Sequence, residues 1–370
     1  MNFDISILVE KIIFGSGRIK ELNNYITGNT TMIVSDPVLN KLGFVTEIEK
    51  NLSGKVIKFC EVEPNPSCET VDKAAKIARE NEVDSVIGFG GGSAIDAAKA
   101  VACLVSNNGI LLEYLDNEKK FKDRTVILIA VPTTSGTGSE VTNVGVYTDK
   151  VNNKKKPLVS DKYWVDYAIV DPELTLSLPK RATATTALDA FIHAIEAYWA
   201  KSTQPFSETL SLKAMKLILQ NIEKAYYEPD NLEARENLST ASLLAGMSFS
   251  QTRTTILHAM SFPLTNIYGL EHGFACALAL PELLRENYEY DKERFDDLIK
   301  YLNFSNVEEM ASKLEEIYNN INAPMKLSEI GVKNEDINKI AEITLSAPIS
   351  RLNPKEFDSA ELIKLFKKIY

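Results

Sequence analysis

The sequence has few histidines and cysteines and no excess of positive charge. It contains 3 His and 4 Cys in 370 residues, and its formal net charge is −10. The acidic balance excludes a general binder of nucleic acid or of anionic membranes, because such proteins need a broad positive field. The four cysteines have no CxxC spacing, so we expect reduced thiols in a cytoplasmic protein, with no disulfide framework and no cysteine ligand. They are Cys60, Cys68, Cys103 and Cys276.

Long apolar runs are also missing. The first residues, MNFDISILVEKIIFGSG, include early acidic side chains and fit neither a signal peptide nor a transit peptide. No window of the sequence has the length of a membrane span. With 45% hydrophobic and 25% charged residues, the composition is that of a soluble globular protein, and the length predicts two domains.

The two halves of the chain differ in periodicity. Four short apolar runs, at 31–36, 85–92, 125–134 and 167–172, read as buried strands, and 70–81 and 93–105 read as helices between them. After about residue 175 the apolar residues recur at helical spacing. We therefore expect an α/β Rossmann-like dinucleotide-binding domain at 1–177, with a largely parallel sheet, and an all-helical domain at 178–370.

Two glycine-rich loops follow predicted strands. In SVIGFGGGSAIDAAKA, the strand runs into Gly90, Gly91, Gly92 and Ser93, and a helix follows at once. Glycines let a ligand approach the backbone, and the free amides of a first helical turn favour an anion, so the arrangement suits a pyrophosphate. A tight strand-to-helix turn is the alternative. The second loop, PTTSGTGSEVT at 132–142, strengthens the dinucleotide interpretation.

Asp36 closes the strand TMIVSD. There its carboxylate could accept hydrogen bonds from an adenosine ribose and repel a 2′-phosphate, which favours NAD over NADP. An Asp at this position is equally often a turn or cap residue.

The three histidines suggest a metal site. Asp189 and His193 are four residues apart in a helical pattern, which places both side chains on one face. With His258 and His272, at the two ends of HAMSFPLTNIYGLEH, they form a set of one carboxylate and three imidazoles. Such a set suits Fe, Zn, Ni or Mn. Histidines hydrogen-bonded within the core are the alternative.

Separated motifs in a fixed order carry a family resemblance. They are FGSG, EPNPS, GGGSAIDAAK, PTTSGTGSE, AIVDPELT, ALDAFIHAIEAY, HAM and EHG. The sequence resembles the iron-dependent (group III) alcohol dehydrogenases over nearly its whole length. This resemblance implies a dehydroquinate synthase-like fold, NAD(H) as cofactor, and a homodimer or higher homo-oligomer. It also implies one divalent metal, Fe²⁺ before Zn²⁺, Mn²⁺ or Ni²⁺, bound by Asp189, His193, His258 and His272.

The resemblance assigns cofactor contacts as well. Lys155 resembles a lysine that reaches the cofactor, although KKK at 154–156 leaves the register open by one residue and a solvated basic loop is the alternative. The implied cofactor-binding residues are Asp36, Asn65, Gly90, Gly91, Gly92, Ser93, Thr133, Thr134, Thr137, Ser139, Thr142 and Lys155.

Two departures from the family pattern concern proton supply and substrate. Where many members have a further histidine, this chain has Phe262, so no catalytic residue beyond the metal ligands is predicted; Phe262 either packs or shapes the substrate pocket. Upstream of His258, the segment TRTT places Arg253 and Thr254 in a largely apolar context, where a guanidinium suits a phosphonate or sulfonate. The alternative pairs Arg253 with a carboxylate in its own domain or across a dimer.

These observations predict an NADH-dependent, metal-dependent reductase of a short aldehyde. TRTT, HAMSFPLT and HGFACALALP resemble the phosphonoacetaldehyde reductase (hydroxyethylphosphonate dehydrogenase) subgroup, so we expect an anionic substrate such as phosphonoacetaldehyde or sulfoacetaldehyde. The metal would act as Lewis acid toward the carbonyl while hydride arrives from the nicotinamide. A general alcohol or diol dehydrogenase acting on butanal, lactaldehyde or 3-hydroxypropanal is the alternative. A dinucleotide- or metal-sensing module without turnover is a more distant one.

Overall fold

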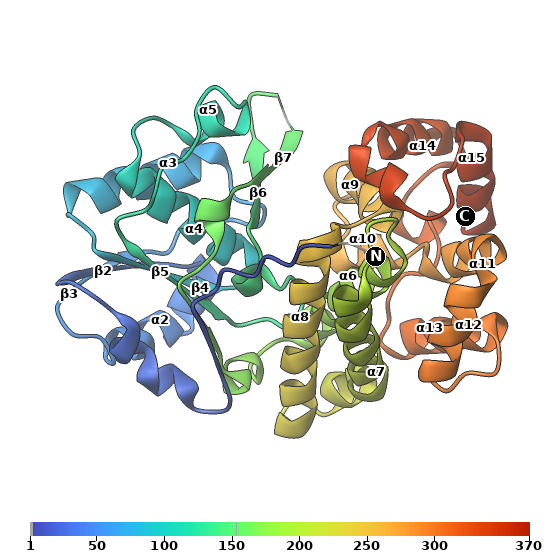
Figure 1. Cartoon of the computed structure of the whole chain (residues 1–370), viewed down its shortest axis with the longest axis horizontal. Coiled ribbons are helices and arrows are strands. Elements are labelled where there is room, and N and C mark those ends of the chain that lie inside the picture. Colours follow the sequence, from blue (N-terminus) through green and yellow to red (C-terminus); the bar gives the residue numbers. More distant parts are fainter. Residues whose placement is uncertain (1–2, 153) are drawn as a thin grey trace. The chain divides into compact units, whose positions relative to one another are not determined.

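The computed structural model describes residues 3–152 and 154–370, and these form two compact units. The first comprises Ser6–Thr134 and Gly138–Leu176. The second comprises Ser177–Tyr370 together with Ser135–Thr137 and residues 3–5. In Figure 1, the strands lie in the segments coloured blue to green, and the segments coloured yellow to red are helical.

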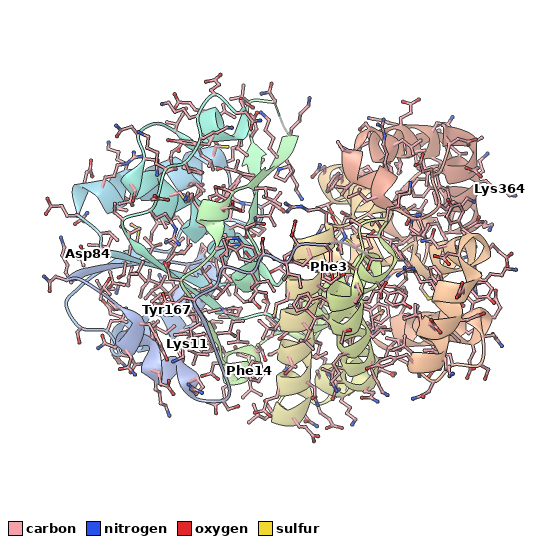
Figure 2. The ribbon with its side chains drawn as sticks, in the orientation of Figure 1. Phe3, Lys11, Phe14, Asp84, Tyr167 and Lys364 are labelled. Atoms are coloured by element: carbon pink, nitrogen blue, oxygen red, sulfur yellow. The ribbon has the colours of Figure 1, made fainter. Side chains whose placement is uncertain are left out.

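The first unit is built on a parallel sheet of six strands in the order β1-β8-β5-β4-β2-β3. Its register is continuous; Lys11 of β1, for example, is opposite Tyr167 of β8 (Figure 2). An antiparallel pair, β6 and β7, lies outside this sheet. The strands are β1 (Lys11–Phe14), β2 (Thr30–Val34), β3 (Lys55–Phe59), β4 (Ser85–Gly90), β5 (Ile127–Pro132), β6 (Val144–Asp149), β7 (Lys154–Val159) and β8 (Tyr167–Val170).

Both faces of the sheet are buried, as parallel sheets require. Alternate strand residues point to opposite faces, so Met32 and Val34 pack with the helices α3 and α4, whereas Ile33 packs on the other side with Val45 and Ile48 of α2. The helices of this unit are α1 (Pro37–Lys41), α2 (Phe44–Glu49), α3 (Cys68–Glu80), α4 (Gly92–Ser106) and α5 (Leu111–Leu115).

The order of the strands places the glycine loop at the point where strands begin to be added on the opposite side of β2. From β2 the chain adds β3 on one side, and β4 is inserted on the other side of β2. In open parallel sheets, ligands bind outside the carboxyl ends of the strands at such a switch point. Asp36 follows β2 and Gly91 follows β4, so both lie where a dinucleotide is expected.

The second unit is helical, and α6 is its central element. Every residue of this helix from Ala187 to Trp199 is buried, because α7, α8 and α10 pack on it. The helices are α6 (Lys180–Trp199), α7 (Pro205–Tyr227), α8 (Leu232–Thr252), α9 (Ile256–Tyr268), α10 (His272–Ala277), α11 (Leu280–Tyr290), α12 (Lys292–Tyr301), α13 (Val307–Asn320), α14 (Ile337–Ser346) and α15 (Ser359–Lys368).

The predicted fold class is confirmed, a parallel α/β unit followed by an all-helical one. The four predicted strands correspond to β2, β4, β5 and β8. Strands β1 and β3 at the two edges of the sheet, and the β6–β7 pair, were not foreseen. No helix in the described part of the chain is long and apolar enough to cross a membrane.

Candidate metal centre and dinucleotide-binding loops

Three helices of the second unit supply the proposed metal ligands. Helix α6 carries Asp189 and His193 one turn apart, α9 carries His258 in its first turn, and α10 begins at His272. Asp189, His193 and His258 are buried, whereas the side chain of His272 is 41% exposed. The site is therefore embedded in the helical core and reaches the surface at His272.

Asp189 is the common neighbour of the imidazoles. Its Oδ1 lies 3.8 Å from Nε2 of His258 and 3.7 Å from Nε2 of His272, and its Oδ2 lies 4.0 Å from Nδ1 of His193. Two ligands that each bind one ion at about 2.1 Å are at most about 4.2 Å apart. The Oδ1 atom is also buried without a hydrogen-bond partner, which is costly unless a cation satisfies it. The donor set thus fits a divalent metal.

A buried carboxylate fixes the orientation of His258. Glu196, two turns after Asp189 on α6, accepts a hydrogen bond from Nδ1 of His258 at 2.6 Å. It also accepts hydrogen bonds from the backbone N–H groups of Thr255 and Leu257, at 3.0 and 2.7 Å. With Nδ1 bound to Glu196, Nε2 lies on the side of Asp189 and the other imidazoles, where it could bind a metal once it has no proton.

The charges of this pair depend on one another. Burial alone would raise the pKa of Glu196, but His258 and the hydrogen bonds from Thr255 hold it below the usual value. Glu196 is therefore an ionised acceptor, and sequence reasoning missed it. Its place seven residues after Asp189 puts it on the same face of α6, and this spacing is the signal that could have revealed it.

His193 lies beside this group in a different environment. Its ring stacks on Phe249 with centroids 4.1 Å apart, and its Nδ1 is 3.3 Å from the carbonyl oxygen of Gly136. Its Nε2 lies 3.1 Å from Nε2 of His258. Burial, followed by the neighbouring His258 and His272 rings, lowers the pKa of His193 well below its usual value, so the ring is neutral and retains a lone pair.

One cluster of possible donor atoms includes a residue that the sequence did not point to. Donor atoms of Asp189, His258, His272 and Cys276 all lie within 4.8 Å of one another. Sequence reasoning gave Cys276 no role, because it has no neighbouring cysteine at ligand spacing. Its position four residues after His272 in α10 brings its sulfur to the same side as the imidazole.

Two glycines let the backbone approach α6 closely at this site. A Cβ on Gly273 would lie 1.8 Å from the carbonyl oxygen of Thr185, and one on Gly136 would lie 2.7 Å from Cβ of Thr186. The start of α10 is also tied to α6 by the N–H of Phe274, which donates to Oγ1 of Thr185 at 3.2 Å. These contacts set the position of His272 relative to Asp189.

The proposed substrate residues lie close to His258 in the chain. Arg253 ends α8 with φ 69° and ψ 173°, a conformation that costs a non-glycine residue about 1–3 kcal/mol. It is half-buried, and burial lowers its pKa. Among the described residues, no carboxylate pairs with its guanidinium, so an ion pair within the domain does not explain it. Thr254 and Phe262 are also half-buried, before and within α9.

In the first unit, the glycine loop brings α4 against the sheet. Gly90 has φ 149°, and a Cβ there would lie 2.8 Å from Cβ of Ala94. Helix α4 then starts at Gly92, with Gly91, Gly92 and Ser93 partly exposed. The first amides of a helix have no partner within it, so this turn offers N–H groups to an anion. The Asn65 N–H donates to Oγ of Ser93 at 3.1 Å, which joins the EPNPS loop to the same turn.

Asp36 acts as a helix cap. Its Oδ1 accepts hydrogen bonds from the N–H groups of Val38 and Leu39, at 2.8 and 3.0 Å. Its Oδ2 points toward the glycine loop, since a Cβ on Gly90 would lie 3.4 Å from it. The capping alternative is therefore real, and the carboxylate also lies beside the proposed cofactor loop.

The remaining residues that were predicted to bind the cofactor lie in different surroundings. Thr133 donates its N–H to the Gly90 carbonyl at 3.0 Å, and Thr134 would lie 3.5 Å from a Cβ on Gly91, so both border the first loop. Thr137 belongs to the helical unit. Lys155 lies on β7 opposite Thr148, and the next residue, Lys156, is held by Asp116 and Asp149.

Ser139 and Thr142 lie in a buried polar network. Lys99, which has no exposed surface, donates to Oγ of Ser139 at 2.8 Å and to Oγ1 of Thr142 at 3.3 Å. Asp96 accepts a hydrogen bond from Ser139 at 2.6 Å. Burial lowers the pKa of Lys99 to about 8. These hydrogen bonds join Asp96 and Lys99 of α4 to the second loop, and the sequence analysis did not foresee either residue.

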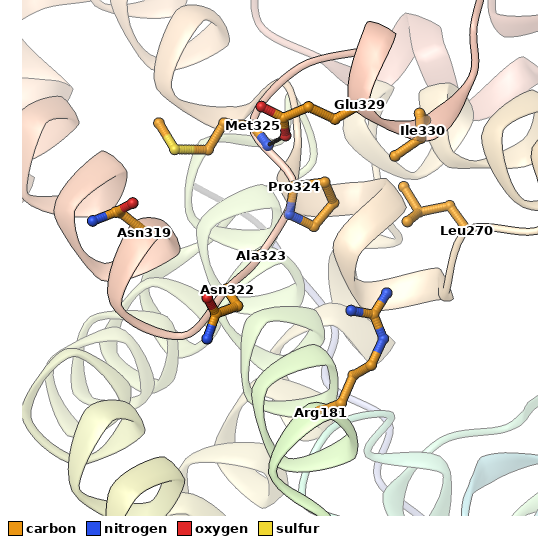
Figure 3. A pocket seen from close by; sticks show the side chains of 9 residues that line it. All are labelled: Arg181, Leu270, Asn319, Asn322, Ala323, Pro324, Met325, Glu329 and Ile330. Carbon is orange, nitrogen blue, oxygen red and sulfur yellow. Dashed lines mark hydrogen bonds between the residues drawn. The ribbon is translucent and has the colours of Figure 1, made fainter.

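A surface pocket of about 400 Å³ lies elsewhere in the helical unit (Figure 3). It contains none of the proposed metal ligands. Its arginine, Arg181, is held by both carboxylate oxygens of Glu271, so its charge is already compensated. We assign it no part in the site. Its lining residues are Arg181, Leu270, Asn319, Asn322, Ala323, Pro324, Met325, Glu329 and Ile330.

Two family models match the chain. "Iron-containing alcohol dehydrogenase" matches residues 10–172, and "Fe-containing alcohol dehydrogenase family, C-terminal" matches residues 183–370. This chain is an iron-containing alcohol dehydrogenase family member. It is therefore an oxidoreductase, and a sensing module without turnover is set aside.

Individual relatives cover nearly all of the chain. The sulfoacetaldehyde reductase of Bilophila wadsworthia is 34% identical over 97% of this chain and 97% of its own length. The NAD-dependent methanol dehydrogenase of Bacillus methanolicus is 30% identical over 96% of this chain and 97% of its own length.

Solved structures of the family have the same fold. The sulfoacetaldehyde reductase of Bifidobacterium kashiwanohense in complex with NAD⁺ has a TM-score of 0.95 and 34% identity, and the match covers 100% of this chain and 99% of that one. A 1,3-propanediol oxidoreductase has a TM-score of 0.93 and 29% identity, with 100% of both chains covered.

Proposed function

We propose that this family member reduces a short aldehyde that carries a sulfonate or phosphonate on the neighbouring carbon, with NADH as the hydride donor and a divalent metal in the site. The aldehyde takes up a hydride from NADH and one proton to give the alcohol, and NADH becomes NAD⁺. The sulfoacetaldehyde reductases among the relatives support this substrate class. The reverse oxidation uses the same groups.

Asp189, His193, His258 and His272 would hold the metal, which when bound supplies a Lewis acid to the carbonyl oxygen. The family description and the unpartnered Oδ1 of Asp189 favour a site for iron or a similar divalent ion over histidines that are only hydrogen-bonded within the core. Glu196 keeps His258 in the tautomer that can bind. The partly exposed ring of His272 leaves the site open on one side for a substrate oxygen.

The glycine loop would hold the cofactor. Gly91, Gly92 and Ser93 offer the first amides of α4 to a pyrophosphate, and Asp36 lies beside them for a ribose hydroxyl. A carboxylate at this position disfavours a 2′-phosphate, so NADH is preferred to NADPH. Asn65, Thr133, Thr134, Thr137, Ser139, Thr142 and Lys155 remain proposed cofactor contacts. Ser139 and Thr142 also accept hydrogen bonds from Lys99 of α4.

Arg253 carries the substrate proposal. A half-buried guanidinium without a carboxylate partner is costly to keep, and its backbone conformation adds further strain. Strain of this kind persists where function requires it, and a planar guanidinium binds sulfonate or phosphonate oxygens in pairs. Thr254 adds a hydroxyl next to it, and Phe262 would form an apolar wall of the substrate pocket.

None of the three imidazoles is available to supply the proton that the product oxygen takes up. The chain has three histidines, and all of them belong to the metal centre. Phe262 occupies the place, four residues after His258, where the resemblance expects a further histidine. Water or a hydroxyl of the cofactor ribose or of a side chain therefore supplies the proton.

The test compares Arg253→Ala and Arg253→Lys with the parent enzyme on sulfoacetaldehyde and on butanal. We expect Arg253→Ala to lower kcat/KM for sulfoacetaldehyde by about a hundredfold and to leave butanal within about threefold, since a lost charge-assisted pair costs about 2–3 kcal/mol. Arg253→Lys should recover part of the loss. Equal losses on both aldehydes would contradict a role in anion recognition.

A general alcohol or diol dehydrogenase is the second candidate, which the methanol dehydrogenase and propanediol oxidoreductase among the relatives favour. It predicts that butanal, lactaldehyde or 3-hydroxypropanal is reduced as well as sulfoacetaldehyde and that neutralising Arg253 has no effect on the best substrate. A homodimer or higher homo-oligomer also remains a prediction, which light scattering on the purified protein would test.

A further inference from the structure

The turn between α8 and α9 connects the proposed anion-binding residue to a metal ligand. Helix α8 ends at Thr252 and α9 begins at Ile256, so residues 253–255 form the whole connection. His258 follows in the first turn of α9. The position of this turn therefore limits the distances at which the guanidinium of Arg253 can lie from the metal centre.

Thr255 is held to the buried carboxylate of Glu196 by two of its groups. Its N–H donates to Oε2 at 3.0 Å, and its hydroxyl donates to Oε1 at 2.6 Å. Each oxygen also has a second donor, the N–H of Leu257 for Oε1 and Nδ1 of His258 for Oε2. A carboxylate has about four acceptor sites, so those of Glu196 are all used. The same carboxylate thus fixes Thr255 and His258 relative to each other.

The hydroxyl of Thr255 does not act as an ordinary helix cap. Thr255 is the N-cap residue of α9, but its side chain forms no capping hydrogen bond with that helix. Its Oγ1 instead accepts a hydrogen bond at 3.1 Å from Nε1 of Trp199, on α6. Thr255 and Trp199 are both buried. Valine has the same shape, but it would leave the indole N–H without an acceptor and Glu196 without one of its donors.

The backbone on the other side of Arg253 is held as well. The N–H of Arg253 donates to the carbonyl of Phe249 at 2.8 Å, and the ring of Phe249 stacks on His193. The hydroxyl of Ser202 donates to the carbonyl of Thr252 at 2.7 Å. The backbone of Arg253 is therefore fixed on both sides, in contacts that lead to two of the imidazoles.

We propose that Thr255 is a positioning residue for substrate length, which together with Glu196 holds Arg253 at a set distance from His258. A substrate with its sulfonate on the carbon next to the carbonyl then reaches Arg253 and the metal centre at once, and a longer one does not. Such fixed placement of two binding groups is effective only if neither can move. The inference rests on the proposed function, because it requires Arg253 to bind the anion.

The first experiment measures binding by calorimetry, with the Zn²⁺-loaded full-length protein and NAD⁺. The ligands are 2-hydroxyethanesulfonate, the alcohol formed from sulfoacetaldehyde, and 3-hydroxypropanesulfonate, which has an additional methylene. We expect the parent protein to bind the shorter sulfonate about tenfold more tightly or better, and Thr255→Val to reduce this ratio to about threefold or less. Thr255→Ser keeps the hydroxyl and should keep the ratio. An unchanged ratio in Thr255→Val would overturn the proposal.

The second experiment compares reduction of sulfoacetaldehyde and butanal. Thr255→Val should lose about tenfold or more in kcat/KM on sulfoacetaldehyde and stay within about threefold on butanal, which needs the metal centre but not Arg253. Thr344→Val is the control, because it removes an equally buried hydroxyl that donates to the carbonyl of Ile340 within α14. Equal losses of Thr255→Val on both aldehydes would mean general support of the fold and would refute the proposal.

The length preference of the parent protein does not depend on any variant folding. A parent protein that prefers sulfoacetaldehyde to butanal but binds both sulfonates equally would refute the set distance and leave the proposed function intact. A parent protein that does not prefer sulfoacetaldehyde to butanal would refute anion recognition by Arg253, and the role of Thr255 would fall with it.

Discussion

Glu196 and His258 form a buried hydrogen bond of 2.6 Å between successive helices of the metal centre. The carboxylate comes from α6, the helix that also carries Asp189, and the imidazole comes from α9. Since the same carboxylate accepts hydrogen bonds from the N–H groups of Thr255 and Leu257, it fixes the start of α9 as well as the ring. A residue that touches no substrate thereby sets the geometry of a ligand.

Replacing Glu196 with Gln should weaken metal binding while keeping the fold. The amide is close in shape but loses the charge and one acceptor, and loss of such an outer partner typically costs about 10–100-fold in metal affinity. Competition with a chromophoric chelator measures the effect. Asp96→Asn, which changes a carboxylate of the other unit, is the control. Unchanged zinc affinity in Glu196→Gln would show that the hydrogen bond does not tune the site.

We expect the strained backbone of Arg253 to lower the free energy of unfolding of the protein. Glycine accepts φ 69° and ψ 173° without strain, so Arg253→Gly should raise the free energy of unfolding by about 1 kcal/mol. Arg253→Ala also removes the guanidinium but keeps the strain, so its free energy of unfolding should be lower than that of Arg253→Gly. Both variants should lose activity on an anionic aldehyde equally. Urea unfolding gives the comparison, and equal stability of the two variants would contradict the strain argument.

Gly273→Ala should disrupt the metal centre. The new Cβ would lie 1.8 Å from the backbone oxygen of Thr185, so α10 has to move and take His272 with it. We expect a loss of about 3 kcal/mol or more in unfolding free energy and a large loss of bound metal. Gly269→Ala is the control, because a Cβ there meets no atom within 4 Å and only its φ of 70° is unfavourable. Retention of one metal per chain in Gly273→Ala would be incompatible with this packing.

The buried carboxyl group of Glu140 should make the free energy of unfolding depend on pH. Burial raises the pKa of Glu140 to about 7 from an ordinary value near 4.5, so the folded state holds a proton that the unfolded state has lost between these values. The contribution of Glu140 to the free energy of unfolding is complete below about pH 4.5 and is lost as the pH rises to about 7. The loss is on the order of 3 kcal/mol for this buried group.

Glu140→Gln tests this directly, because the amide stays neutral. The variant should match the parent protein in unfolding free energy near pH 4.5 and should exceed it at pH 8. A difference between the two proteins that does not change with pH would contradict the assignment. Glu63→Gln, at a partly exposed carboxyl whose hydrogen bonds lower its pKa, should not reproduce the gain.

The fold could be predicted from the sequence where elements are long and strongly patterned. Buried strands such as β4 read as continuous apolar runs, whereas β3, with the sequence KVIKF, is an edge strand with two exposed lysines. Edge strands often carry such charges, which weakens the pattern that would reveal them. The β6–β7 pair was missed because β7 begins with three lysines and contains a proline.

The site could be predicted only in part. Asp189 and His193 share a helix face, and this local relationship is visible in the sequence. Glu196 forms a hydrogen bond with His258, 62 residues later, so its role depends on packing between helices. Ser139 and Thr142 have the hydroxyls expected of a cofactor loop, and the buried Lys99 donates a hydrogen bond to each of them. Hydrogen-bonding capacity is visible in a sequence, but the direction of a side chain is not.

The most direct test of the proposed function is the rate of NADH oxidation by Fe²⁺-reconstituted enzyme with sulfoacetaldehyde, phosphonoacetaldehyde and butanal. The account predicts that one anionic aldehyde exceeds butanal in kcat/KM by about a hundredfold or more, which corresponds to about 2.7 kcal/mol of transition-state discrimination. It also predicts that metal-free protein is inactive on all three. Equal or faster turnover of butanal would contradict an anion-binding site at Arg253 and would leave a general alcohol dehydrogenase.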